Sequence, residues 1–332
     1  MNKRQKRYIE DVTYGKKKRI LHILSLVGRY TILVLMALFF MFPVIYMIVV
    51  SFQSDLAAVS PSSIIPRLED FSTSGYKDFF HRASFFKGIG NTLMVCVLCI
   101  AGILIGATFC AYGLTKVYFK GQRAMFIIIL ATVFLPGTVT AIPLFTIYQK
   151  IGWINTLFPL WVPIWFGGGA MNIFLVRQFM RGIPKSLHES AKIDGANSLQ
   201  ILLSVIVPLV RPILLYLAIT TFIGTWNDYS APLLYLTTST SPKTFALLIF
   251  EAFQDKRDPL LLNGQMATGI FMMIPTTILF GFFQKELTEG IAPLSRRYKA
   301  VFLLMWQILY NWSFEMIFGY DALIVSIADF SI

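Results

Sequence analysis

A polar segment with a distinctive spacing lies at residues 184–200, between two apolar runs, and reads Pro-Lys-Ser-Leu-His-Glu-Ser-Ala-Lys-Ile-Asp-Gly-Ala-Asn-Ser-Leu-Gln. Its two carboxylates, Glu189 and Asp194, can accept hydrogen bonds or ion pairs from a partner molecule. Neither this segment nor the rest of the chain contains an H-E-x-x-H or G-x-S-x-G pattern. The segment therefore favours recognition over catalysis.

The same segment is punctuated like two short helices with a turn between them. Ser186 and Glu189 have the spacing of a capping box, in which each side chain bonds a backbone N–H group at the start of a helix. Gly195 allows the positive φ that ends many helices, and Asn197 or Ser198 can cap the next helix. We expect a compact, exposed helical knob, suited to docking in a groove on a cytoplasmic partner.

Cysteines and a glycine run could also carry chemistry. Cys96 and Cys99 form a C-x-x-C pair, but they share an apolar run with Cys110 and have no second pair of ligands nearby. We expect buried thiols and no metal site. The run Gly167–Gly169 is followed by no Lys-Ser or Lys-Thr, so it does not predict a phosphate-binding loop.

The histidines favour no catalytic arrangement. His22, His81 and His188 lie far apart in the sequence, and His188 is expected on the surface of the knob. The sequence therefore predicts a chain that is not an enzyme and that holds no cofactor.

The elements that position the knob follow from composition. Of the 332 residues, 56% are hydrophobic and only 14% are charged, which is typical of an integral membrane protein. A membrane crossing needs about 20 apolar helical residues, and the runs are too long for the strands of a barrel. We predict an all-α integral membrane fold with six transmembrane helices, at about 30–50, 90–113, 124–146, 157–176, 209–227 and 266–284.

Charge sets the expected orientation. The net charge is +12, and basic residues cluster before the first span and after spans two and four, which predicts a cytoplasmic N-terminus. The opposite loops, 51–89 and 228–265, are near charge balance and should face outward. A basic run beside a span favours contact with membrane lipid over nucleic acid, and the first apolar run is too long for a cleaved signal peptide. We expect a multi-pass protein of the cell membrane.

Several residues inside the spans predict bends and close packing. Gly102 and Gly106 form a G-x-x-x-G pattern that lets another helix approach. Prolines inside the spans suit kinked helices around a cavity or gate, although membrane helices are rich in proline in any case. The prolines are Pro43, Pro136, Pro143, Pro163, Pro212 and Pro275. Arg211 would be costly at the bilayer centre, so span five should begin near Leu209, with a cytoplasmic segment at 184–208.

The knob also carries a family signature. Glu189-Ser-Ala-Lys-Ile-Asp-Gly-Ala, followed by Val207-Pro-Leu and Pro212, resembles the E-A-A-x-x-D-G-A…L-P-x-x-x-P pattern of permease subunits in binding-protein-dependent ABC importers. Ser190 stands where that family commonly has Ala, and Val207 where it has Leu. Both are mild departures.

Further motifs over roughly residues 30–290 resemble the maltose-type, carbohydrate-uptake branch of this family. They are Asn91-Thr92-Leu93, Ala111-Tyr112-Gly113-Leu114, Ile142-Pro143-Leu144 and Trp226-Asn227. The resemblance implies transport of a sugar or short oligosaccharide into the cytoplasm by alternating access.

The resemblance also assigns roles. It implies that the coupling loop 184–200 holds a coupling helix that sits in a cleft of a cytoplasmic ATPase subunit, through Glu189, Ser190, Ala191, Asp194, Gly195 and Ala196. Trp226 and Asn227 are candidates for the translocation pathway, and loop 228–265 is expected to reach toward an extracellular solute-binding protein. A second, related permease subunit would complete the cavity.

The expected domains are a basic cytoplasmic N-terminus at 1–29, the permease domain at 30–290 and a C-terminal extension of unknown role at 291–332. In this extension, residues 300–318 are apolar with polar residues recurring every four positions, which predicts an amphipathic helix at the membrane interface.

Two alternatives stay open at this point. One is an ion-coupled secondary transporter, although the six spans offer no Asp or Glu near their centres for ion coupling. The other is an ABC importer permease for a solute that is not a sugar, since such a relative would share the knob.

Overall fold

A computed structural model describes residues 3–55, 70–254 and 261–290. Within these ranges the chain is helical, and the described residues form no β-strand beyond one isolated antiparallel bridge between Gln53 and Phe71. Apolar helices satisfy their own backbone hydrogen bonds, which a hydrocarbon environment requires. The expected all-α class is confirmed. The chain divides into two compact units, residues 1–49 with 297–332, and residues 50–296.

In the first unit, the described residues belong to α1 (Lys3–Ser51), which continues by two residues into the second unit. Its part from Ile23 to Ser51 is apolar and long enough to cross a membrane. Large apolar side chains such as Leu35, Phe39 and Phe42 are exposed along it, as expected for a helix in contact with lipid. The expected C-terminal helix at 300–318 lies outside the described residues.

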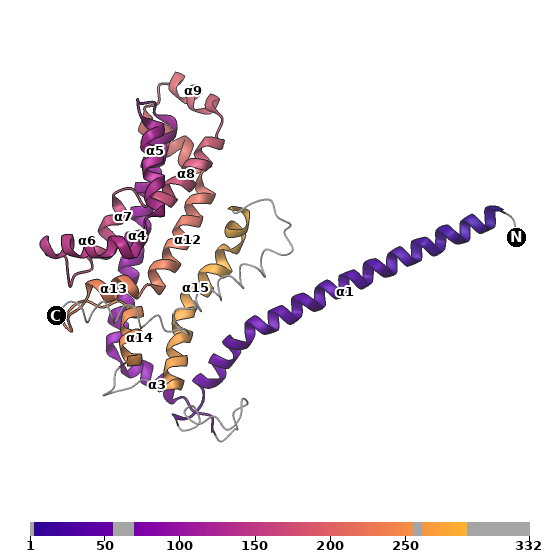
Figure 1. The fold of residues 1–332 in the computed structure, drawn as a ribbon, viewed down its shortest axis with the longest axis horizontal. Coiled ribbons are helices and arrows are strands. Elements are labelled where there is room, and N and C mark those ends of the chain that lie inside the picture. The colour runs from indigo at the N-terminus through magenta and orange to yellow at the C-terminus, as the bar shows by residue number, and fades with distance from the viewer. Residues whose placement is uncertain (1–2, 56–69, 255–260, 291–332) are drawn as a thin grey trace. The chain divides into compact units, whose positions relative to one another are not determined.

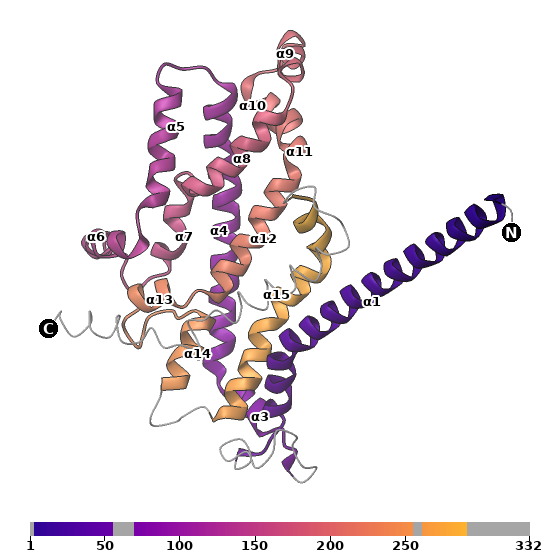
Figure 2. The same cartoon turned by 45° about the vertical axis from the view of Figure 1, so that its right-hand side comes forward.

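The second unit is organised around α4 (Ala83–Lys116), which contains the expected span 90–113 and extends beyond it at both ends. This helix packs against α7, α8, α12 and α14, whose bounds follow (Figures 1 and 2). A Cβ atom on Gly102 would lie 2.7 Å from the Trp165 ring, and one on Gly106 would lie 3.0 Å from the backbone nitrogen of Gly168. The G-x-x-x-G pattern therefore marks close packing, as predicted.

The expected span 124–146 is not one continuous helix. The structure has α5 (Gln122–Ala131), the short 3-10 helix η2 (Thr132–Phe134) and α6 (Gly137–Lys150), and the two helical parts are bent by 100°. Pro136 stands at the break; it has no N–H group to continue a helix and it forces Leu135 into an extended conformation with ψ 116°.

The expected span 157–176 is also interrupted. It comprises α7 (Phe158–Trp165) and α8 (Ala170–Gly182), with Gly167, Gly168 and Gly169 between them at φ 113°, 70° and 88°. Side chains rarely adopt these angles. A Cβ atom on Gly168 would lie 2.9 Å from the backbone nitrogen of Ala107, so this glycine run allows the chain to bend directly against α4.

The region around the knob follows α8. It comprises α9 (Lys185–Ile193), α10 (Ser198–Gln200), a π-helix η3 (Ile201–Ile206), α11 (Val207–Leu209) and α12 (Arg211–Asn227). The expected span 209–227 corresponds closely to α12, and the helical stretch Ser198–Leu209 meets it at 77°. The last described helix, α15 (Leu262–Gly290), contains the expected span 266–284.

At the end of α4 that lies away from α9, the chain forms α3 (Ser74–His81), α13 (Ser230–Tyr235) and α14 (Phe245–Gln254) (Figures 1 and 2). The ring of Phe79 stacks on Phe271 of α15 at 3.9 Å between centroids, and both lie in an apolar core with Phe245 and Trp226. Much of the expected loop 228–265 is therefore folded and packed. A second core, around α4, α8, η3 and α12, lies beneath the knob.

Among the described residues, four helical stretches are long and apolar enough to cross a membrane, or up to six if each bent pair counts as one crossing.

Candidate functional site

The knob at residues 184–200 ends its first helix in the way the sequence predicts. Gly195 has φ +82°; its N–H donates to the Lys192 carbonyl at 3.1 Å, and the N–H of Ala196 donates to the Ala191 carbonyl at 3.0 Å. This is a Schellman motif, which satisfies carbonyls that a helix end would otherwise leave free. The turn after α9 is thus defined by its backbone.

The second helix of the knob is capped by Asn197. Its side-chain oxygen accepts from the Gln200 backbone N–H at 2.9 Å, and its own N–H donates to the Gln200 side chain at 2.8 Å. These reciprocal bonds form a capping box. Together, the Schellman motif and this box hold the segment between α9 and α10 in one conformation.

The predicted capping box at Ser186 and Glu189 is not formed. Pro184 occupies the N-cap position of α9, and the helix begins at Lys185. Ser186 therefore lies inside the first turn and cannot act as the N-cap. Its carbonyl accepts a hydrogen bond at 2.8 Å from the Ser190 hydroxyl. Proline at this position presets φ, which moves the start of the helix ahead of the serine.

The two faces of α9 differ. Glu189, Asp194 and Ile193 are exposed, and Ile193 is 86% exposed despite its apolar side chain. Ala191 and Ala196 pack against the apolar core beneath the knob. The predicted site residues therefore divide into an outward group that can meet a partner and an inward group that seats the helix.

His188 is on the inward face, and its expected place on the surface is wrong. It is only 9% exposed, and its ring lies 6.2 Å from that of Tyr112 in α4. Burial, and then the positive charges of Lys192 and Lys116, lower the pKa of His188 below its ordinary value of 6.5, while Glu189 opposes this shift. The imidazole is thus favoured in its neutral form.

The knob is anchored on both sides. After it, Ile201, Leu202 and Ile206 of η3 are fully buried in the core, so the later part of the expected cytoplasmic segment 184–208 packs against the bundle. Before it, Lys116 donates to the Ile183 carbonyl at 3.1 Å, tying the end of α4 to the connection between α8 and α9.

A further tie at this end was not predicted. Arg177 of α8 donates from Nε to the Leu114 carbonyl at 3.2 Å, and its guanidinium lies 3.8 Å from the ring centroid of Phe126 in α5. The sequence suggested only orientation for Lys116 and Arg177, because a charge pattern does not reveal a carbonyl acceptor 67 or 63 residues away.

Trp226 and Asn227 lie at the opposite end of α12 from the knob. Trp226 is 2% exposed; its indole N–H donates to the Met272 carbonyl at 2.9 Å, and its ring stacks on Phe222. Asn227 donates to the Ile223 carbonyl at 2.8 Å. The structure therefore does not bring these two candidates together with the knob residues.

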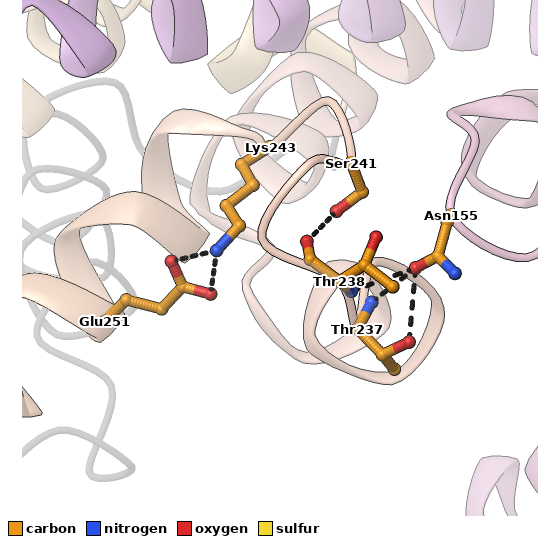
Figure 3. Close-up of polar contacts among 6 residues, drawn as sticks. All are labelled: Asn155, Thr237, Thr238, Ser241, Lys243 and Glu251. Atoms are coloured by element: carbon orange, nitrogen blue, oxygen red, sulfur yellow. Dashed lines mark hydrogen bonds and ion pairs between the residues drawn. The ribbon is translucent and has the colours of Figure 1, made fainter.

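A polar cluster at this far end is shown in Figure 3. Asn155 has φ +64°, and its side-chain oxygen accepts from the backbone N–H groups of Thr237 at 2.9 Å and Thr238 at 3.1 Å. Nearby, Lys243 bonds both carboxylate oxygens of Glu251 at 2.7 and 2.6 Å. Residues 236–244, here called the far loop, are fixed by these contacts.

Two of the three cysteines are buried, as predicted. Cys96 and Cys99 are buried, and Cys99 donates to the Leu160 carbonyl at 3.4 Å, while Cys110 is partly exposed. All three are free, and no group of three His, Cys, Asp or Glu side chains able to hold a metal occurs among the described residues.

Known proteins similar to this chain cover most of its length. Residues 99–292 match the family described as the binding-protein-dependent transport system inner membrane component. The galactooligosaccharides transport system permease protein GanQ of Bacillus subtilis (strain 168) is 28% identical over 82% of this chain and 96% of its own length. The trehalose/maltose transport system permease protein MalG of Thermococcus litoralis is 28% identical, over 81% of this chain and 94% of its own length.

A solved structure is similar as well. One chain in the crystal structure of a bacterial ABC transporter involved in the import of the acidic polysaccharide alginate superposes with a TM-score of 0.69 and 25% identity, covering 80% of this chain and 96% of that chain.

These matches confirm the class of protein that the signature indicated. The family is a membrane permease component of ABC importers, in which ATP hydrolysis takes place in a separate subunit, and its members work with a solute-binding protein. With several apolar helices long enough to cross a membrane, the protein is a multi-pass protein of the cell membrane. The chain belongs to the family of inner membrane components of binding-protein-dependent transport systems.

Proposed function

We propose that this chain is one of two permease subunits in an ATP-driven importer that moves a sugar or short oligosaccharide into the cytoplasm. The printed functions of its relatives support this substrate class, since they include transport of galactooligosaccharides, trehalose or maltose, and arabinooligosaccharides. The single observation that carries the mechanism is the knob, an exposed helix on a turn fixed by its own backbone bonds.

In this proposal the chain crosses the membrane six times, with each bent helix pair serving as one crossing. The N-terminus is cytoplasmic, and so is the knob. The basic residues near α9 support this orientation, because Lys116, Arg177, Arg181, Lys185 and Lys192 gather at one end of the second unit.

The knob then docks in a cleft of a cytoplasmic ATPase subunit. Ile193 is its apolar anchor, because an exposed isoleucine at the end of a polar helix gains most from burial against a partner. Glu189 and Asp194 offer carboxylates to polar groups at the rim of the cleft. Ser190, Ala191 and Ala196 are small, which lets the helix lie close to its neighbours, and Gly195 sets the turn.

Transport follows from movement of this knob. Closing and opening of a separate ATPase pair shifts the knob, and its anchors carry the movement to α4 and α12. The bundle then alternates between inward-open and outward-open arrangements, around a cavity completed by a second, related permease. The chain itself needs no cofactor. Asn227 at the end of α12 contributes to the pathway together with Trp226, and their side chains are held by hydrogen bonds to the Ile223 and Met272 carbonyls.

A second candidate substrate class has its own support. The osmoprotective compounds uptake permease protein GgtD of Synechocystis is 29% identical over 68% of this chain. The same knob would serve an importer of such solutes. The two classes are separated by uptake of a labelled oligosaccharide into cells that express the whole system. Unlabelled oligosaccharides and unlabelled osmoprotective solutes are compared as competitors of this uptake.

The docking is tested by purifying the tagged chain from its native membrane in mild detergent and identifying the co-purifying subunits. We expect an ATPase and a second permease with the wild type, and loss of the ATPase with Ile193→Asp. The matched control is Leu234→Asp, an exposed leucine in α13 at the far end, which should retain the ATPase. Retention of the ATPase by Ile193→Asp would contradict docking through α9, and a wild-type chain without any ATPase would contradict the importer.

A further inference from the structure

His188 is a buried ionisable side chain at the joint between the knob and the transmembrane bundle. It lies on α9 three residues before Ala191, and both face the core that contains Tyr112 of α4. In the knob it is the one described residue whose side chain is both ionisable and buried. Any movement of α9 away from α4 must open this contact.

The joint holds a polar atom without a partner. The Nδ1 atom of His188 is buried and makes no hydrogen bond within the described part of the chain. A histidine with a purely structural role is ordinarily fixed through such a bond. No hydrogen bond fixes Nδ1 here, so the charge state of the ring can decide how well it fits against Tyr112.

The charges around the joint disfavour a protonated ring. Lys192 and Glu189 approach from α9, and Lys116 approaches from α4. The helix η3, which packs against α9, and the helix α10 before it contribute no charged side chain between Ser198 and Ile206. Two positive charges therefore face one negative charge, and a proton on His188 would add a third positive charge to a buried site.

We propose that His188 is a positioning residue whose neutral form seats the knob on α4 more firmly than its protonated form, so that mild acidification loosens the knob and weakens coupling in the importer. The effect on the importer rests on the function proposed above, whereas the effect of pH on the contact between the knob and α4 does not. The seat would act as a sensor of cytoplasmic pH placed at the contact through which the ATPase acts.

The direction of the pH effect follows from the lowered pKa of the seated form. A released imidazole takes up a proton near its ordinary pKa of 6.5, whereas the seated one does so only at lower pH. Seating is therefore complete above 6.5. It weakens as the pH falls from 6.5 toward the lower pKa of the seated ring, and it changes no further below that value.

Hydrogen–deuterium exchange of the intact complex tests the seat. Exchange of α9 amides is compared at pH about 7.5 and about 5.5, each time as a ratio to the variant His188→Gln, which keeps a neutral polar side chain. We expect this ratio to rise at least about threefold on acidification. A control variant, His81→Gln in the exposed part of α3, should show the same rise as the wild type. A ratio that stays constant would overturn the proposal.

A second variant keeps the test independent of how well His188→Gln folds. Lys192→Gln removes one of the opposing charges from an exposed position, so the pKa of the seated ring should rise toward 6.5 and the transition in α9 exchange on acidification should become smaller. An unchanged transition would contradict the role assigned to these charges.

The amount of ATPase subunit that remains bound at the two pH values then separates the two proposals. Faster α9 exchange together with loss of the ATPase supports both. Faster exchange with full retention of the ATPase supports the histidine seat alone, whereas a chain that holds no ATPase at either pH contradicts docking through the knob.

Discussion

The hydroxyl of Thr92 in α4 accepts a hydrogen bond at 2.8 Å from the backbone N–H of Phe245, a residue 153 positions later at the start of α14. The same hydroxyl donates to the Gly88 carbonyl at 2.9 Å, and both ends of the contact are buried. A single side chain thus joins the central helix to the helix that follows the far loop.

Replacing Thr92 by valine should test this link, because valine has nearly the same shape and no hydroxyl. The buried N–H of Phe245 would then be left unpaired, at a cost of about 1–3 kcal/mol in the free energy of unfolding. Thermal unfolding of the purified chain in detergent measures the loss. The exposed Thr138→Val in α6 is the matched control and should leave Tm unchanged. Equal Tm values for both variants would show that the link contributes nothing.

Two glycines separate the cost of backbone angle from the cost of crowding. Gly152 has φ +74° and open space around a Cβ atom, so Gly152→Ala should cost about 1–2 kcal/mol for the angle alone. Gly168 has φ +70°, and its Cβ atom would lie 2.9 Å from the Ala107 backbone, so Gly168→Ala should cost about 1–3 kcal/mol more. Both are measured as shifts in Tm. Similar losses for the two variants would argue against close packing of α4 on the glycine run.

A substitution series at Gly195 should separate the turn from the helix. Asparagine tolerates positive φ, so Gly195→Asn should retain the ATPase in co-purification. Gly195→Ala should weaken the turn by about 1 kcal/mol, and Gly195→Val should weaken it further and lose the ATPase, because a β-branched side chain fits this angle poorly. Full retention by Gly195→Val would show that the turn is not needed for docking.

Asn155 should control the order of the far loop. Its side-chain oxygen accepts three hydrogen bonds from Thr237 and Thr238, so Asn155→Leu should destabilise the loop by about 2–4 kcal/mol. Asn155→Asp keeps the acceptors and the tolerance of positive φ, and should stay close to the wild type. Hydrogen exchange of residues 236–244 is the measurement.

The nearby ion pair provides the comparison for Asn155. Lys243→Met removes a partly exposed pair and should cost about 1 kcal/mol or less. If the loop exchanges faster in Lys243→Met than in Asn155→Leu, the ion pair and not the asparagine fixes the loop.

Features of the knob that depend only on neighbouring residues could be predicted from the sequence. Gly195 and Asn197 act on backbone groups within five residues, so their types and spacing were enough to predict the turn and the second cap. The Ser186 cap was wrong for a local reason too, since Pro184 fixes an earlier start of α9.

Features that depend on distant residues could not be predicted. His188 was expected at the surface, because nothing in its own segment shows that Tyr112 and the core lie against it. Asn155 gave no signal, since its partners lie 82 and 83 residues away. The sequence predicts a kink in span 124–146 from Pro136, but a proline alone does not give the size of the bend, which is 100° between α5 and α6.

The run Gly167–Gly169 also constrains the gene. All three residues have φ values that a side chain rarely adopts, and the middle one lies against the backbone of α4. Any first-base or second-base change in a glycine codon either introduces a side chain or stops translation. Only third-base changes leave this bend intact. Of the nine nucleotides that encode the run, only the third one of each codon can therefore vary.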